Sequence, residues 1–133
     1  MDQRLTFITL GVKDLIKSSE FYENIFGWKR AEMSNEHLKT YQLNGLFLAL
    51  YSREELAKDA TVESIGNGFK GFTLSYNVES EKAVDDLIQQ LKNKGVKIIK
   101  EPQKVIWGGY SSYIADIDEN LWEIAYNPYL NID

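Results

Sequence analysis

The stretch Ile8-Thr9-Leu10-Gly11-Val12-Lys13-Asp14-Leu15 decides the fold, because two sequence patterns meet in it. Residues 5–12 are rich in β-forming side chains, and Asp14 is of a residue type favoured at a helix N-cap. Apolar side chains then recur at helical spacing as far as Phe26, and Gly27 follows where a helix commonly ends in a left-handed residue. The sequence therefore predicts a strand that leads directly into a helix.

Three further strands are predicted in the first half of the chain, at residues 28–33, 38–43 and 46–51. Asn44-Gly45 separates the last two and is a strong hairpin signal, because both central residues of a type I′ turn need a positive φ. Ser52-Arg53-Glu54-Glu55 has the pattern of a capping box before a short helix. The first half is thus expected to read β-α-β-β-β.

The same order of elements returns in the second half of the chain. After a polar stretch at residues 59–68, a strand is predicted at residues 71–78, followed by a helix that starts at Ser80 and ends before Gly95. Further strands are expected at residues 96–100, 110–115 and 121–126. Both halves have the same pattern, so the chain is predicted to carry an internal duplication.

The predicted fold class is α+β, with two tandem βαβββ modules in a single domain spanning residues 1–133. Module 1 covers about residues 3–58, a linker covers residues 59–68, and module 2 covers about residues 69–128. One helix cannot cover both faces of a curled sheet, so the concave face of each module needs a partner. We expect the curled mixed sheets of the two modules to form a trough.

Length, composition and charge narrow the class of protein. A chain of 133 residues suits one ordinary domain, and a hydrophobic content of 44% is enough for a core without metals or disulfides. The net charge of −5 disfavours nucleic acid as a partner, and the longest apolar run, residues 46–51, is too short to span a bilayer. Cysteine is absent, which removes thiolate metal sites and cysteine nucleophiles. We expect a cytoplasmic protein that binds neither nucleic acid nor a membrane.

With three further motifs, the chain resembles a known family. These are Ser19-Glu20-Phe21-Tyr22, Phe26-Gly27-Trp28 and the closing segment 116–128. Together with the duplicated unit they are similar to the glyoxalase/bleomycin-resistance/dioxygenase group, the vicinal oxygen chelate superfamily. The resemblance spans nearly the whole chain and implies the two-module fold. It leaves the reaction open, because this superfamily includes lyases, dioxygenases, thiol transferases, epimerases and binding proteins that catalyse nothing.

The closing turn of the second module departs from the sequence that is common in relatives. Asp116-Ile117-Asp118-Glu119-Asn120 lacks both the proline and the glycine of that turn. Asn120 is expected to take the positive φ in place of the glycine, because Asn tolerates the left-handed conformation better than most residues.

The resemblance also implies where family enzymes hold a divalent metal, with a His near the start of each module and a Glu or His on each module's last strand. Those positions fall here on Phe7, on Thr73 or Phe72, near Leu48 or Ala49, and on Glu123. Of these side chains only Glu123 can bind a metal, and one carboxylate cannot hold a catalytic cation that needs several donors. We therefore predict no metal and no other cofactor, with a divalent metal as the alternative. The sole histidine, His37, lies in a polar turn outside these positions.

Strand alternation predicts which side chains face the trough. A carboxylate between Leu121 and Ala125 would be partly desolvated, so Glu123 is predicted to act as an acid/base group or as a clamp for a cationic or hydroxylated ligand. The alternative is a Glu123 that reaches solvent or pairs with a lysine or arginine. The predicted ligand-binding residues are Phe7, Thr9, Thr73, Ser75, Asn77, Trp107, Tyr110 and Tyr113. Packing in the core or in a dimer is the alternative to ligand stacking for five aromatic residues: Trp28, Tyr41, Trp107, Tyr110 and Tyr113.

The leading functional hypothesis is a protein without a complete metal site that binds a small apolar or aromatic molecule in the trough, by sequestration. We expect a homodimer, because paired modules in this family often come from two chains and open sheet edges gain from pairing. Whether the protein is an enzyme stays open. One alternative is a metal-dependent or Glu-based lyase or dioxygenase of the same superfamily. The other is a non-catalytic dimeric module with a regulatory or scaffold role.

Overall fold

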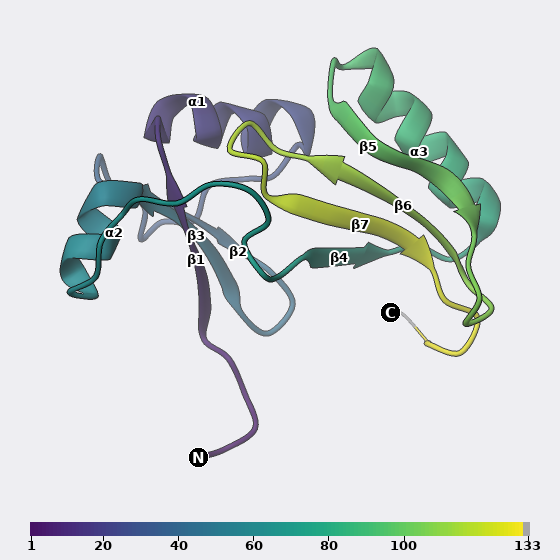
Figure 1. Ribbon diagram of the computed structural model, residues 1–133, viewed down its shortest axis with the longest axis horizontal. Helices are drawn as coiled ribbons and strands as arrows, with labels where there is room; N and C mark the ends of the chain where they lie inside the picture. Colours follow the sequence, from purple (N-terminus) through teal and green to yellow (C-terminus); the bar gives the residue numbers. More distant parts are fainter. Residues whose placement is uncertain (132–133) are drawn as a thin grey trace. The chain divides into compact units, whose positions relative to one another are not determined.

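Each half of the chain builds its own β-sheet (Figure 1). The computed structural model describes residues 1–131, and the chain divides into two units between Asn67 and Gly68. The strands are β1 (Phe7–Val12), β2 (Leu38–Gln42) and β3 (Phe47–Ser52) in the N-terminal unit, and β4 (Leu74–Asn77), β5 (Lys97–Lys104), β6 (Tyr110–Ala115) and β7 (Leu121–Tyr126) in the C-terminal unit. This mixed architecture of helices and two sheets confirms the predicted fold class.

The N-terminal unit has a three-stranded sheet with the order β1-β3-β2, in which β1 is parallel and β2 antiparallel to β3. Its helices are α1 (Leu15–Glu20), the π-helical turn η1 (Phe21–Ile25) that continues it, and α2 (Arg53–Asp59). Along β1, Leu10 and Val12 are buried whereas Phe7 and Thr9 are exposed, as the alternation predicts. Helix α1 contacts β2 and β3 on the buried side of the sheet.

Side-chain caps confirm the predicted helix starts. The Asp14 carboxylate accepts the backbone N–H of Lys17 at 3.0 Å, which caps α1. The Ser80 hydroxyl accepts the backbone N–H of Ala83 at 3.0 Å, which caps helix α3 (Glu81–Asn93). Each cap satisfies one of the N–H groups that a helix leaves unpaired in its first turn.

Residues 28–33 do not form the strand predicted from the sequence. This segment meets β2 where the Ala31 N–H donates to the Thr40 carbonyl at 2.8 Å, while the Thr40 N–H donates to the Ser34 hydroxyl at 2.9 Å. A side chain thus takes the place that strand backbone would occupy. The N-terminal unit therefore has the element order β-α-β-β, not β-α-β-β-β.

The hairpin between β2 and β3 also differs from the predicted type I′ turn. Gly45 has a φ of 85°, but among the described non-glycine residues only Thr61 and Glu119 have a positive φ. Asn44 therefore does not adopt the left-handed conformation that a type I′ turn requires at its first central residue.

The C-terminal unit has a four-stranded sheet with the order β4-β7-β6-β5, in which β4 is parallel to β7 and the other pairs are antiparallel. Helix α3 packs along β5, β6 and β7 (Figure 1) through the buried Val84, Ile88 and Leu91. The predicted β-α-β-β-β order is confirmed in this unit. Strand β5 extends past its predicted end through Pro102, which is tolerated because β5 is an edge strand with irregular register.

None of the helices within residues 1–131 is both long and apolar enough to cross a lipid bilayer.

Candidate functional site

Glu123 on β7 accepts hydrogen bonds from three hydroxyl groups. Ser75 on β4 donates to Oε1 at 2.5 Å, and Ser111 and Tyr113 on β6 donate to Oε2 at 2.7 Å and 3.5 Å. Because β7 lies between β4 and β6 in the sheet, the carboxylate receives donors from both neighbouring strands. We call these four side chains the hydroxyl–carboxylate cluster.

The strand register explains why these side chains meet. Ser75 lies directly opposite Glu123 in the parallel β4–β7 pair, and Tyr113 lies directly opposite Glu123 in the antiparallel β6–β7 pair. Ser111 precedes Tyr113 by two residues, so it shares the same face of β6. The alternate residues of β7, Trp122 and Ile124, are buried. The cluster therefore occupies the face of the sheet that α3 does not cover.

The position of Tyr113 beside Glu123 changes its pKa. Burial, and after it the charge and hydrogen bond of Glu123, raise the pKa of Tyr113 above its ordinary value. A hydrogen bond with the Thr73 side chain acts in the opposite direction and lowers the pKa of Tyr113. Tyr113 itself donates to Glu123, and this bond favours the neutral phenol.

The direction of these bonds sets the polarity of the cluster. The hydroxyl protons of Ser75, Ser111 and Tyr113 all point towards Glu123. The lone pairs of the more exposed Ser75 and Tyr113 oxygens, together with the remaining acceptor capacity of the carboxylate, are then left for a ligand. The arrangement suits a hydrogen-bond donor or a cation and disfavours an anion.

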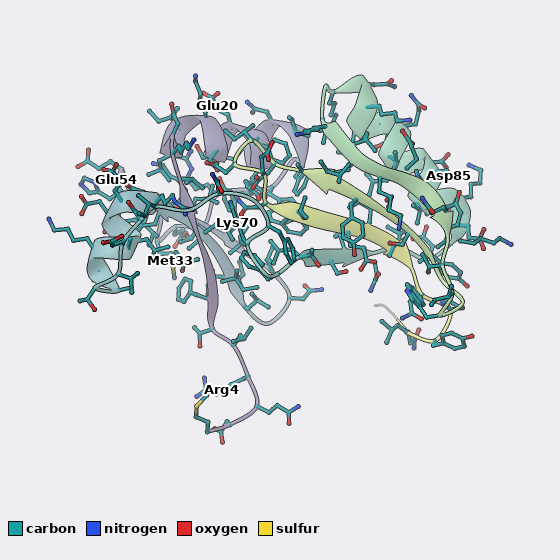
Figure 2. All side chains as sticks on the ribbon, in the orientation of Figure 1. Arg4, Glu20, Met33, Glu54, Lys70 and Asp85 are labelled. Atoms are coloured by element: carbon teal, nitrogen blue, oxygen red, sulfur yellow. The ribbon has the colours of Figure 1, made fainter. Side chains whose placement is uncertain are left out.

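Tyr110 lies away from this cluster, although the sequence placed it among the ligand-binding residues. Its hydroxyl donates at 2.8 Å to Asp85 on α3, the helix residue labelled in Figure 2. In the β6–β7 pair Tyr110 lies opposite Tyr126 and alternates with Ser111, so it faces the helix side of the sheet. Tyr110 and Glu123 therefore lie on opposite faces of the sheet.

Two other predicted residues lie near the ends of the same strands. Asn77 is half-buried at the end of β4, opposite Ala125. Trp107 lies in the loop between β5 and β6, where its indole ring covers the backbone of Gly109 so closely that a Cβ there would collide with it. The structure shows neither side chain hydrogen-bonded to Glu123.

Ser111 is a member of the cluster that sequence reasoning missed. The available signal was its position, two residues before Tyr113 in the predicted strand 110–115. Among the described residues, the hydrogen-bond partners of Glu123 are hydroxyls, whereas the ion pairs involve other carboxylates.

Phe7 and Thr9 belong to the N-terminal unit, on the exposed face of β1. Phe7 is 40% exposed, and its ring stacks on Phe47 of β3 with 5.2 Å between ring centroids. In the register of the sheet these two residues lie directly opposite each other. Phe7 and Phe47 thus form an aromatic pair at the start of β1 and β3.

The residues around Glu123 do not fit a divalent metal. Glu123 is the one carboxylate in the cluster, and Ser75, Ser111 and Tyr113 contribute hydroxyls. Carboxylates, carbonyls, imidazoles and thiolates are the protein groups that divalent cations prefer. Across residues 1–131, no three His, Asp or Glu side chains come together in an arrangement that could hold an ion.

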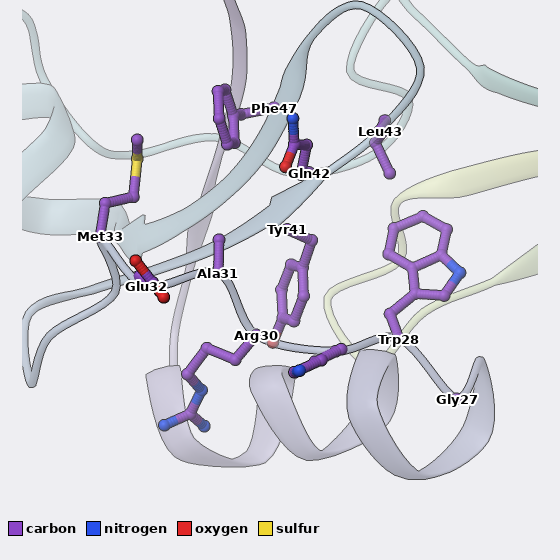
Figure 3. A pocket seen from close by; sticks show the side chains of 11 residues that line it. Gly27, Trp28, Arg30, Ala31, Glu32, Met33, Tyr41, Gln42, Leu43 and Phe47 are labelled. Carbon is purple, nitrogen blue, oxygen red and sulfur yellow. The ribbon is translucent and has the colours of Figure 1, made fainter.

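A groove of about 840 Å³ lies in the N-terminal unit, between residues 28–33 and strands β2 and β3 (Figure 3). Trp28, Ala31, Met33, Leu43 and Phe47 give it an apolar surface, and Gln42 adds an amide. Sequence reasoning missed this groove because it predicted residues 28–33 to be a strand of the sheet.

Comparisons with known proteins agree with this fold. The model of the Glyoxalase/Bleomycin resistance protein/Dioxygenase superfamily matches residues 4–124. The fosfomycin resistance protein FosX of Listeria monocytogenes is 29% identical over 126 residues, which cover 90% of this chain and 86% of FosX. The metallothiol transferase FosB of Lysinibacillus sphaericus is 33% identical over 121 residues, covering 91% of this chain and 80% of FosB.

Solved structures of related proteins share this fold. A glyoxalase-related enzyme from Fulvimarina pelagi has a TM-score of 0.88 and 34% sequence identity, covering 98% of this chain and 93% of its own. The crystal structure of FosX from Listeria monocytogenes has a TM-score of 0.71 and 27% identity, covering 97% of each chain. With the family model matching most of its length, the chain belongs to the glyoxalase/bleomycin resistance protein/dioxygenase superfamily.

Proposed function

We propose that this protein binds a small molecule with an apolar or aromatic body and a hydrogen-bond-donating or cationic group, and that it acts by sequestration. The observation that carries this proposal is the hydroxyl–carboxylate cluster. Its three hydroxyls all donate to Glu123, so the face they share offers acceptors to a ligand. In this proposal Glu123 receives the donor group of the ligand, the exposed Ser75 accepts one of its remaining hydrogens, and the buried Ser111 holds the carboxylate in place.

Preorganisation supports binding by this cluster. The Glu123 carboxylate is held by bonds to both of its oxygens, so it loses little side-chain freedom when a ligand arrives. An ammonium group on a carboxylate forms a charge-assisted hydrogen bond, which is stronger than a bond between neutral groups. The half-buried position of Glu123 limits the competition from water.

A matched pair of probes tests the proposal. Benzylamine and benzoate share an aromatic ring but carry opposite charges. We expect benzylamine to raise the melting temperature in a thermal-shift titration and benzoate to leave it unchanged, since a ligand at ten times its Kd stabilises the native state by about 1.4 kcal/mol. Stabilisation by benzoate alone, or by neither probe, would contradict the proposal.

Variants connect the binding to the site. Glu123→Gln should weaken benzylamine binding by about ten-fold or more, because it replaces the charged acceptor with a neutral amide that also donates. The exposed Glu63, in the N-terminal unit, provides the matched control, and Glu63→Gln should bind like the wild type. The melting temperature of each variant without probe shows whether it folds. Equal affinity in both variants would place the binding elsewhere.

The relatives favour a second candidate, a metal-dependent transferase that acts on fosfomycin. The supporting observation is the 29–33% identity to proteins named fosfomycin resistance protein and metallothiol transferase. Phosphorus NMR of fosfomycin with the protein, a thiol and Mn²⁺ tests this candidate. A new product signal that requires both protein and Mn²⁺ supports it over sequestration, and unchanged fosfomycin leaves the binding proposal in place.

We propose in addition that the protein is a homodimer. Strands β1 and β2 end the sheet of the N-terminal unit, and β4 and β5 end the sheet of the C-terminal unit. Edge strands carry unpaired backbone groups that favour association with another chain. Size-exclusion chromatography with light scattering should give twice the chain mass of 15.3 kDa. A mass equal to that of a single chain would contradict the dimer.

A further inference from the structure

The groove of the N-terminal unit opens where the predicted strand 28–33 fails to pair along β2. Ala31 holds the segment to β2 through its hydrogen bond to Thr40. On either side of this point the space between the segment and the end of β2 is lined by Met33, Gln42 and Phe47 (Figure 3). Functional sites are expected where the structure departs from the local sequence pattern, because residues at such sites are selected for function as well as for folding.

Packing and hydrogen bonds outside the groove fix the positions of several residues that line it. The Trp28 ring packs against Phe26 at 5.3 Å and Tyr22 at 5.6 Å between ring centroids. Tyr41 is buried, and its hydroxyl donates to Glu23 at 2.8 Å. Phe47 is backed by its stack with Phe7. The groove is therefore formed before any ligand arrives, which lowers the entropic cost of binding.

Three charged side chains, Lys29, Arg30 and Glu32, line the groove beside its apolar surface. Arg30 donates through Nε at 3.1 Å and through a terminal nitrogen at 2.8 Å to the same oxygen of Glu23. Figure 3 shows its side chain pointing away from Met33 and Phe47, towards the helix. Lys29 and Glu32 are exposed. Lys29 and Glu32 carry opposite charges and both line the groove, so its lining favours neither sign of ligand charge.

We infer that this groove is a second ligand-binding site, and that it takes a neutral, flat aromatic ring. Its volume of about 840 Å³ falls in the range of pockets that hold small molecules. The Phe47 ring offers an aromatic contact, and the Met33 thioether is a flexible partner that packs well against aromatic rings. The exposed amide of Gln42 can donate to or accept from a polar atom on the ring. This site lies in the other unit from Glu123 and rests on different residues.

Methionine methyl NMR tests the inference directly, because the chain has two methionines, Met1 and Met33. With methyl-¹³C methionine, Met33 reports on the groove and Met1, exposed near the chain start, serves as an internal control. Indole is the probe, since it is neutral, flat and carries one N–H. We expect a saturable ring-current shift of the Met33 methyl signal and an unchanged Met1 signal.

Matched variants locate the probe. Phe47→Leu keeps apolar bulk but removes the ring, and it should weaken indole binding by about five-fold. Phe72→Leu, at an exposed phenylalanine of the C-terminal unit, should leave binding unchanged. The ¹³C and ¹H spectra without indole show whether each variant is folded. For a variant that is unfolded, Gln42→Glu is the replacement, and its added charge should also weaken binding of the neutral ring.

Three results would overturn the inference. The first is the absence of a saturable Met33 shift. The second is an equal shift of Met1 and Met33, which indicates non-specific contact. The third is a Met33 shift that follows protein concentration without indole, which indicates that a second copy of the chain occupies the groove instead of a small molecule.

Discussion

Ser75 and Glu123 lie directly opposite each other in the parallel β4–β7 pair, and the Ser75 hydroxyl donates to Glu123 Oε1 at 2.5 Å. This bond joins an edge strand to the strand beside it through side chains as well as backbone. It also turns the hydroxyl proton away from a ligand, so that the serine oxygen becomes an acceptor. The ligand class proposed for the protein follows from this orientation.

The two serines of the cluster should differ in their effect on stability. Ser111 is buried whereas Ser75 is exposed. Ser111→Ala should lower the free energy of unfolding by about 1–2 kcal/mol, because it removes a buried hydrogen bond to a charged group, and Ser75→Ala should cost less than about 1 kcal/mol. Urea unfolding followed by circular dichroism measures both values. The reverse order would show that burial does not govern these bonds.

Tyr113 and Tyr110 should behave differently because they lie on opposite faces of β6. Tyr113→Phe removes a donor to Glu123 and should change the affinity for benzylamine. Tyr110→Phe removes a bond to Asp85 on the helix side and should leave that affinity unchanged. Isothermal titration of both variants provides the comparison. A larger effect of Tyr110→Phe would contradict the assignment of faces.

Tyr41 should make the protein sensitive to alkaline pH. Burial, and after it the hydrogen bond and charge of Glu23, raise the pKa of Tyr41 well above its ordinary value of 10.0, against the opposing charge of Arg30. Because the pKa is higher in the folded state, the stability that the neutral phenol contributes is fully present below about pH 10 and is lost as the pH rises through the folded value. The free energy of unfolding should therefore fall above about pH 10.

Urea titrations across this range test the origin of the effect. Tyr41→Phe should make the alkaline fall in stability less steep, while Tyr113, whose pKa is also raised, keeps part of it. Tyr129→Phe, at a side chain that is 76% exposed, is the control and should leave the slope as in the wild type. Identical slopes for all three proteins would show that the titration of Tyr41 is not coupled to unfolding.

Thr61 is a strained position whose relief should stabilise the protein. It is exposed and has a φ of 60°, a conformation that is unfavourable for a β-branched residue. Thr61→Gly should raise the free energy of unfolding by about 0.5 kcal/mol, since glycine removes the strain but adds freedom to the unfolded chain. Gly95→Ala, at a φ of 82°, should have the opposite effect and cost about 1 kcal/mol. Thermal unfolding of both variants compares the two positions.

Local rules predict much of the fold and part of the candidate site. The caps at Asp14 and Ser80 depend on residues three positions apart, so the sequence alone indicates them. Alternation along β4 and β7 likewise places Ser75 on the same face as Glu123. These features depend on residues that are close in sequence or on the period of a strand.

The sequence did not predict the loss of strand 28–33 or the conformation of the closing turn. Both depend on which of several suitable groups forms a hydrogen bond or adopts the positive φ. The Ser34 hydroxyl takes the Thr40 N–H, and residues 28–33 lose their strand as a result. In the closing turn Glu119 has the positive φ that was expected of Asn120. The Asn120 side chain instead donates to Asp116 and accepts from Lys70, 50 positions earlier in the chain. No local pattern reports such bonds.

The most direct test of the central claim is a crystal structure grown in the presence of both benzylamine and Mn²⁺. We predict the ammonium nitrogen within hydrogen-bonding distance of Glu123, with the hydroxyl of Ser75 beside it. A manganese ion held at Glu123 by three or more protein atoms would contradict the proposed function.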